Sequence, residues 1–204
     1  MLQGGHSDAL LGVATTSPWT ERGKQLSTIL RTTQIATGGV ASSMDSWLVL
    51  RGIRTLNLRA QQQSQTAQQI AEYLQQRQQQ SSSLIKDVHY PGLSTHPQHD
   101  IAKQQMKMVN NDVTGSPIFG GVLSLEFHDD ASAMAFAGAL QTIQRATSLG
   151  GTETLIEHRA SIEPPGRVTS PPGLLRISVG LEDVSDLIRD MDRAFSIVNM
   201  IINK

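Results

Sequence analysis

The chain of 204 residues has a net charge of −1 at pH 7, 38% hydrophobic residues and no cysteine. This balance is typical of a globular protein, and a charge so close to zero excludes the bulk attraction that nucleic-acid or membrane-surface binding uses. No run of about 18 apolar residues is present, so we expect no membrane-spanning helix. The lack of cysteine excludes disulfides, thiolate nucleophiles and cysteine-ligated zinc, and with no recognisable signal peptide we expect a cytoplasmic protein.

The N-terminal segment is expected to contain one short helix. The apolar run at 9–14 is strand-like, but its pattern is ambiguous. A helix is predicted over 20–32, with Ser17 or Thr20 as its N-cap. The Thr-Gly-Gly sequence at 37–39 should end this helix.

Residues 44–80 form the longest periodic segment of the chain. Apolar residues recur at helical spacings, which predicts a helix about 55 Å long if it is continuous. Gly52 costs roughly 1 kcal/mol within such a helix, so a kink there is compatible with the pattern. The many glutamines of 61–80 are interpreted as a solvated helical face, with a prion-like tract as the alternative. The apolar stripe consists of Leu48, Ile53, Leu56, Ala60, Ala67, Ile70 and Leu74.

The serines at 81–83 mark the best internal boundary. After them short strands alternate with helices, which predicts an α+β lobe with an antiparallel or mixed sheet covered by helices. Loops are expected at 110–112 and 115–117. The expected strands are 85–90, 121–127 and 174–179, and the expected helices begin near 96–100, at 129–131 and at Asp183.

One arginine lies inside an otherwise apolar, strand-like run. Arg176 stands in the sequence LRISVG at 175–180, and arginine is rarely buried without an anionic partner. Its fork of donors binds a carboxylate or a phosphate in a bidentate manner. The Ser-Leu-Gly-Gly turn at 148–151 offers free backbone N–H groups in addition. The pattern therefore fits a carboxylate clamp for a ligand, while an internal pair with Asp or Glu is slightly favoured by the residues alone.

Other polar clusters are compatible with chemistry but do not require it. His89, His96 and His99 lie near Asp100 in sequence, as metal ligands do, although separate surface histidines explain them better. The charged residues at 153–159 fit acid–base groups and a charged strand edge equally well. No serine nucleophile elbow, P-loop or dinucleotide fingerprint is present. The residues by themselves predict neither a metal site nor a catalytic group.

Five stretches, taken together and in order, resemble one enzyme family. They are GHSD at 5–8, DSWLVLRGIRTL at 45–56, YPGLSTHPQH at 90–99, SLGGTETL at 148–155 and LRISVGLED at 175–183. The chain resembles the trans-sulfuration (Cys/Met metabolism) family of pyridoxal-phosphate-dependent enzymes. That family includes cystathionine γ-synthase, cystathionine β-lyase, cystathionine γ-lyase and methionine γ-lyase. The resemblance covers essentially the whole chain.

This resemblance implies the C-terminal part of a fold-type I, aminotransferase-like α/β enzyme with pyridoxal 5′-phosphate as cofactor. Residues 1–83 would be the end of the large cofactor-binding domain with a long linking helix, and 84–204 the small α+β domain. Arg176 would hold the α-carboxylate of an amino-acid substrate such as cystathionine, with Ser148 beside it. Thr147 joins this substrate-binding set, because it stands where γ-synthases and γ-lyases commonly carry a glutamate. The reaction would be a C–S cleavage or a γ-replacement, and the family implies a homo-oligomer, usually a homotetramer.

The resemblance also implies that part of the active site is missing. The family's Schiff-base lysine aligns with Met1, so no catalytic lysine is expected here and the chain would be truncated and inactive alone. The residues that bind the cofactor would lie upstream, and none is identified in this chain. Two further hypotheses are a catalytically dead subunit that pairs with a full-length paralogue and a free carboxylate-binding domain using Arg176. Without the upstream sheet, apolar residues near 9–13 and 48–56 should be exposed.

Overall fold

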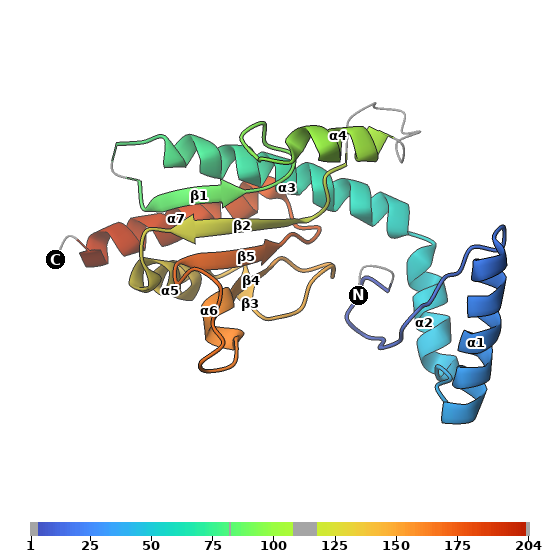
Figure 1. The fold of residues 1–204 in the computed structure, drawn as a ribbon. Coiled ribbons are helices and arrows are strands. Elements are labelled where there is room, and N and C mark those ends of the chain that lie inside the picture. The colour runs from blue at the N-terminus through green and yellow to red at the C-terminus, as the bar shows by residue number, and fades with distance from the viewer. Residues whose placement is uncertain (1–3, 82, 108–117, 203–204) are drawn as a thin grey trace.

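The protein is described here by a computed structural model that covers residues 4–81, 83–107 and 118–202. An N-terminal arm, residues 9–53, extends from a lobe of sheet and helices formed by residues 56–202 (Figure 1). The elements in chain order are α1 (Glu21–Thr37), α2 (Ser43–Ile53), α3 (Leu56–Gln78), β1 (Ile85–His89), α4 (His99–Lys107), β2 (Val122–Phe127), α5 (Asp130–Ala139), β3 (Gln144–Arg145), β4 (Leu155–His158), α6 (Arg159–Ile162), β5 (Leu174–Ser178) and α7 (Val184–Ile202).

The lobe contains a mixed five-stranded sheet in the order β1-β2-β5-β4-β3. Its pairs are antiparallel except β3 with β4, which is parallel, so the predicted antiparallel or mixed sheet is confirmed. The strand with the internal arginine, β5, lies at the centre of the sheet. Helices α3, α5 and α7 pack together against one face (Figure 1).

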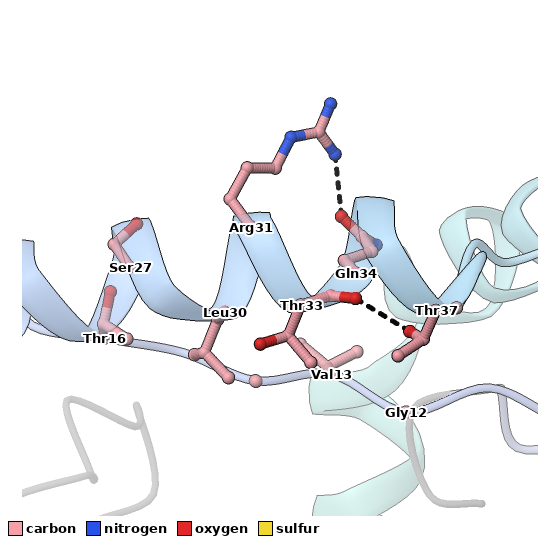
Figure 2. Close-up of a pocket in the computed structure, with 11 residues that line it drawn as sticks. Gly12, Val13, Thr16, Ser27, Leu30, Arg31, Thr33, Gln34 and Thr37 are labelled. Atoms are coloured by element: carbon pink, nitrogen blue, oxygen red, sulfur yellow. Dashed lines mark hydrogen bonds between the residues drawn. The ribbon is translucent and has the colours of Figure 1, made fainter.

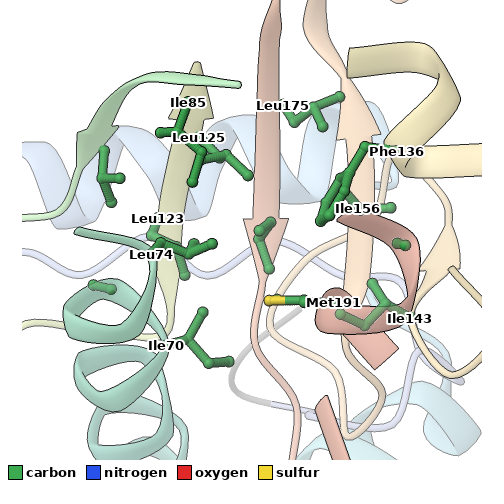
Figure 3. Packing of buried hydrophobic residues seen from close by; sticks show 14 of the residues in the cluster. Ile70, Leu74, Ile85, Leu123, Leu125, Phe136, Ile143, Ile156, Leu175 and Met191 are labelled. Atoms are coloured by element: carbon green, nitrogen blue, oxygen red, sulfur yellow. The ribbon is translucent and has the colours of Figure 1, made fainter. Parts of the chain in front are cut away.

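The core lies between that face and the three helices. Side chains from alternate positions of β2, β4 and β5 meet those of α3, α5 and α7, as Figure 3 shows for Leu74, Leu125, Ile156 and Leu175 among others. An aromatic cluster completes one end: the rings of Phe136 and Phe195 have centroids 4.4 Å apart. Period-2 alternation thus places apolar residues inward and leaves polar ones, such as Arg176, on the opposite face.

The long helix predicted over 44–80 is wrong as a continuous element. It is two helices, α2 and α3, separated at Arg54 and Thr55, and Figure 1 shows a sharp change of direction between them. Gly52, the weak helix former, stays inside α2, but its carbonyl accepts hydrogen bonds from Thr55 N (3.2 Å) and Arg59 Nη2 (2.7 Å). The buried Arg59 guanidinium therefore stabilises the break that the glycine permits.

Several other local predictions are corrected or confirmed. The strand-like run at 9–14 forms no strand, and the short elements β3 and α6 were not predicted. Helix α1 has Thr20 as its N-cap, with its hydroxyl accepting from Gly23 N at 3.0 Å, and ends at Gly38 in the left-handed region. The loops predicted at 110–112 and 115–117 lie outside the described residues.

The arm exposes an unusual amount of apolar surface. The exposure expected for 9–13 and 48–56 is confirmed, since Leu10 is 89% exposed and Leu50 60%, with Val49 a buried exception. No helix among the described residues is long and apolar enough to cross a membrane. The large apolar side chains of the arm that are at least 46% exposed are Leu10, Val13, Trp19, Ile29, Ile35, Val40, Met44, Trp47, Leu50 and Ile53.

A buried carboxylate ties the end of α5 to α7 just before β3. Asp190 accepts backbone N–H groups of Gln141 (3.0 Å), Thr142 (2.8 Å) and Ile143 (3.2 Å), and Arg193 Nη2 donates to it at 2.7 Å. Burial by itself would raise the pKa of Asp190, but the hydrogen bonds from Arg193 and the three N–H groups outweigh it and hold the pKa below its usual value.

Replacing this carboxylate should destabilise the lobe in a pH-dependent way. We expect Asp190→Asn to lower the free energy of unfolding by about 1–3 kcal/mol at pH 7. Because the folded-state pKa is depressed, the stabilisation is present above the unfolded pKa of about 4 and is lost as pH falls through the folded value. Urea unfolding at pH 7 and pH 3 measures this, with the exposed Asp186→Asn as control. If the difference in free energy of unfolding between wild type and Asp190→Asn were the same at pH 3 as at pH 7, the prediction would be wrong.

Candidate functional site

The arm contains a groove, but its lining is not that of a catalytic site. The groove, about 570 Å³, lies between the extended segment at 12–16 and α1 (Figure 2). Arg31 is the one charged residue among those that line it, and its side chain points away and donates to Gln34 Oε1 at 2.7 Å. The remaining lining is apolar, hydroxyl or amide. The chemistry predicted from the sequence lies elsewhere, at β5.

Arg176 is the centre of the candidate site. It lies in the middle of β5, opposite Ser124 of β2 on one side and Glu157 of β4 on the other. Its Nη2 donates to the carbonyl oxygens of Thr147 (2.8 Å) and Ser148 (2.9 Å). The three residues predicted to bind substrate are therefore adjacent in the structure, although the contacts of Arg176 with Thr147 and Ser148 use their backbone carbonyls.

Both alternatives considered for Arg176 find support in its surroundings. Its Nη2 lies 2.6 Å from Oε2 of Glu157, a carboxylate whose side chain is only 2% exposed, so an internal ion pair is present. Arg176 Nε and Glu157 Oε2, however, are both buried and have no hydrogen-bond partner among the described residues, so the close pair leaves a donor and an acceptor unmatched. A buried donor without a partner is costly, and a ligand acceptor would remove that cost.

The glycine turn beside Arg176 is held from three directions. Gly150, at φ 73°, donates its N–H to Ser178 Oγ of β5 at 2.9 Å. Gln63, buried on α3, donates from Nε2 to the carbonyl of Gly151 at 2.6 Å. A Cβ on Gly151 would lie 3.2 Å from Ser7 Oγ, so glycine allows the GHSD stretch to approach the turn closely. Two motifs far apart in sequence thus meet at this turn.

Sequence reasoning missed two members of this arrangement. Gln63 lies among many glutamines, and nothing in the sequence distinguishes it from its solvated neighbours. Glu157 belongs to the charged run at 153–159, which fits acid–base groups or a strand edge; it is in fact the buried partner of Arg176. Pairing of β4 with β5 would have identified it, because the register places Glu157 directly opposite Arg176.

The side chains of His89 and His99 have different partners in the structure, and His99 N donates to the carbonyl of His96 at 3.0 Å. His89 lies 3.4 Å from Glu126, and His99 Nδ1 contacts the carbonyl of Pro91 at 2.8 Å while its ring stacks on Phe119. No cluster of three or more His, Cys, Asp or Glu that fits a metal ion occurs in the described part of the chain.

Tyr90 of the YPGLSTHPQH stretch and His158 of β4 are tied into the fold by hydrogen bonds. Tyr90 is fully buried, and its hydroxyl donates to the carbonyl of Gly120 at 2.8 Å. Burial raises the pKa of Tyr90 to about 12, so it stays neutral at physiological pH. His158 is also tied internally, with Nε2 donating to the carbonyl of Pro172 at 2.5 Å and lying 3.1 Å from Asp130 Oδ1.

Known proteins match this fold and these motifs along almost the whole chain. The family model for the Cys/Met metabolism PLP-dependent enzyme matches residues 3–196. The chain is 39% identical over 198 residues to cystathionine beta-lyase of Lactococcus lactis subsp. cremoris (strain MG1363) and 37% identical over 198 residues to cystathionine gamma-lyase of Bacillus subtilis. Each alignment covers 94% of this chain and 47% of the relative.

A solved structure gives the same result for the fold. Cystathionine gamma synthase from Xanthomonas oryzae pv. oryzae, in complex with aminoacrylate and cysteine, superposes with a TM-score of 0.77 at 31% sequence identity. The match covers 98% of this chain and 48% of that one. The predicted fold class is confirmed, and the chain spans about half the length of the relatives that it matches.

Loss of the Gln63 amide should loosen the glycine turn. We expect Gln63→Leu to lower the free energy of unfolding by about 1–3 kcal/mol, because the buried carbonyl of Gly151 loses its donor. Hydrogen exchange at Gly150 N–H should also become faster. Urea unfolding and amide exchange measure the two effects, and Gln65→Leu at an exposed position of the same helix is the matched control. Equal free energies of unfolding and equal exchange rates in both variants would contradict a role of the Gln63 hydrogen bond in holding the turn.

Proposed function

The chain belongs to the Cys/Met metabolism PLP-dependent enzyme family, and from this premise we propose that it forms the substrate-carboxylate half of a trans-sulfuration active site. The substrate would be cystathionine or a related sulfur amino acid, undergoing C–S cleavage or γ-replacement. In this proposal residues 1–83 belong to the large domain with its linking helix, and 84–204 form the small domain. The cystathionine lyases among the relatives support the substrate class.

The observation that carries the proposal is the buried, unpartnered Nε of Arg176. Nη2 is engaged by the carbonyls of Thr147 and Ser148 and by Glu157, so the guanidinium is fixed by internal contacts. Arg176 Nε stays without a hydrogen-bond partner although Glu157 Oε2, which also has none, lies on the facing residue, so the internal pair does not satisfy the guanidinium. A substrate α-carboxylate that accepts from Nε satisfies it by a charge-assisted hydrogen bond.

Pyridoxal phosphate is the cofactor of the family, and the described residues do not fit its attachment. The cofactor is held as an imine by a lysine in a shielded pocket, where it supplies an electron sink. Among the described side chains, Lys24, Lys86 and Lys103 are exposed. The first two form ion pairs at 2.7 Å with Glu21 and Glu126. This chain's own contribution is therefore to bind and orient the carboxylate, and we assign the cofactor side to polypeptide beyond the described residues.

The exposed arm supports a requirement for additional polypeptide. Ten large apolar side chains between Leu10 and Ile53 are at least 46% exposed, whereas the lobe has a closed core. Exposed apolar side chains in such number are typical of a surface that another polypeptide covers. We propose that it is covered by protein equivalent to the half of the relatives that the chain does not span, within a homo-oligomer or on a full-length paralogue. A catalytically dead subunit on such a paralogue is the second candidate function.

Removal of the guanidinium should weaken carboxylate binding. We expect Arg176→Ala to weaken the binding of cystathionine by at least about tenfold, because a charge-assisted hydrogen bond and the attraction of a full charge are lost. Calorimetric titration of the purified chain measures this, with Arg167→Ala at an exposed loop position as control. Equal affinities for the wild type and Arg176→Ala would reject the proposed site.

The chain alone should not form an imine with the cofactor. Incubation with pyridoxal phosphate is expected to give no borohydride-sensitive visible band above that of free lysine, because the described lysines lack a shielded pocket. Absorbance spectra before and after borohydride test this, with the Lactococcus lactis cystathionine beta-lyase measured in parallel. A stable, reducible band on this chain would place the cofactor site within it.

A further inference from the structure

The carboxylate of Glu157 is shared by two arginines. Its Oε2 lies 2.6 Å from Nη2 of Arg176, and its Oε1 pairs with Nη1 of Arg159. The Glu157 side chain is 2% exposed, that of Arg176 15% and that of Arg159 32%. The most buried member of the cluster is therefore the acid, and both cations reach it from more exposed positions.

Glu157 is the most rigidly placed of the groups that contact Arg176. The two residues are direct neighbours in the β4–β5 ladder, so backbone hydrogen bonds fix the distance between them. Thr147 and Ser148, which also accept from Nη2, lie in the turn after β3, where Thr147 is exposed. A contact made across the strand ladder therefore sets the orientation of the guanidinium more firmly than the turn carbonyls, which Arg176 itself helps to hold.

The charges of the cluster leave Arg176 attractive to an anion. Two guanidinium groups face one carboxylate in Glu157, and Arg159 has a second acid nearby, with its Nη2 3.9 Å from Oε1 of Glu163. Glu163 is itself fixed by Ser170 and by the backbone N–H of Thr169, and these hydrogen bonds lower its pKa to about 2, so it stays charged. The positive charge of Arg159 therefore faces two carboxylates, Glu157 and Glu163, whereas that of Arg176 faces only Glu157, which it shares with Arg159.

We propose that Glu157 is the positioning residue of the Arg176 guanidinium, and that Arg159 shares its carboxylate so that Arg176 keeps positive charge for a substrate carboxylate. This inference rests on the proposed function, since it assigns roles around the same arginine. Glu157 acts through Arg176 and does not touch the substrate. Removal of Glu157 frees the guanidinium to rotate, and removal of Arg159 makes Glu157 hold Arg176 more tightly while cancelling more of its charge.

Nitrogen-15 NMR of the guanidinium in the full chain tests both roles. The Arg176 signals are assigned by their loss in Arg176→Lys, and exchange of the Nη groups reports rotation of the guanidinium. We expect Glu157→Gln to speed this rotation about tenfold, the effect of losing one charged contact of roughly 1.4 kcal/mol. Arg159→Met should slow the rotation and weaken cystathionine binding several-fold. Glu153→Gln, an exposed acid of the preceding turn, is the matched control.

Each outcome decides between the roles. A guanidinium rotation rate in Glu157→Gln equal to that in the control would overturn the positioning role. If Glu157→Gln does not fold, the rotation rate in Arg159→Met provides the test, because the Arg159 side chain is one-third exposed and its loss should cost little stability. Unchanged rotation and affinity in Arg159→Met would overturn the charge-sharing role. Titration of the wild type with cystathionine separates the proposals: no shift of Arg176 Nε rejects the proposed function, whereas a shift with unaltered rotation in the variants rejects only this inference.

Discussion

A guanidinium placed in the middle of a central strand is a demanding requirement, and the lobe is arranged around it. Arg176 lies on the polar face of β5, and Glu157 meets it across the ladder at 2.6 Å. Burying either charge alone would cost several kcal/mol, so each makes the other tolerable. The pair leaves one buried donor, Arg176 Nε, and one buried acceptor, Glu157 Oε2, without a hydrogen bond among the described residues. The ion pair therefore permits burial of both charges without satisfying all of their hydrogen-bonding atoms.

The turn after β3 depends on that guanidinium and on two further anchors. Arg176 donates to the carbonyls of Thr147 and Ser148. Ser178 Oγ accepts from the N–H of Gly150, and Gln63 of α3 donates to the carbonyl of Gly151. These groups come from a central strand and a buried helix. The turn consequently has an orientation imposed by the core, as a binding site that must hold a small carboxylate requires.

The sequence predicted most of what depends on local pattern and missed what depends on pairing. Alternation located β5 and β2, and the Thr20 cap and Gly38 located the ends of α1. The pattern allowed a kink at Gly52, but it did not predict the full break at Arg54 and Thr55, which a hydrogen bond of Arg59 to a carbonyl seven residues earlier stabilises. Arg176 was recognised by its oddity, whereas Glu157 needed the strand register. Ordered motifs supplied the family, which no periodicity or spacing reveals.

The contrast between arm and lobe bears on how the site is completed. Helix α1 has both caps and 17 residues, so it can form from local interactions, yet its apolar side chains Ile29 and Ile35 remain more than half exposed. The lobe, in contrast, closes its own core around β2, β4 and β5. The proposed carboxylate site is therefore built on the part of the chain that is already packed. In that proposal, the polypeptide that covers the arm adds its groups to a guanidinium whose position is fixed beforehand, which lowers the cost of binding substrate there.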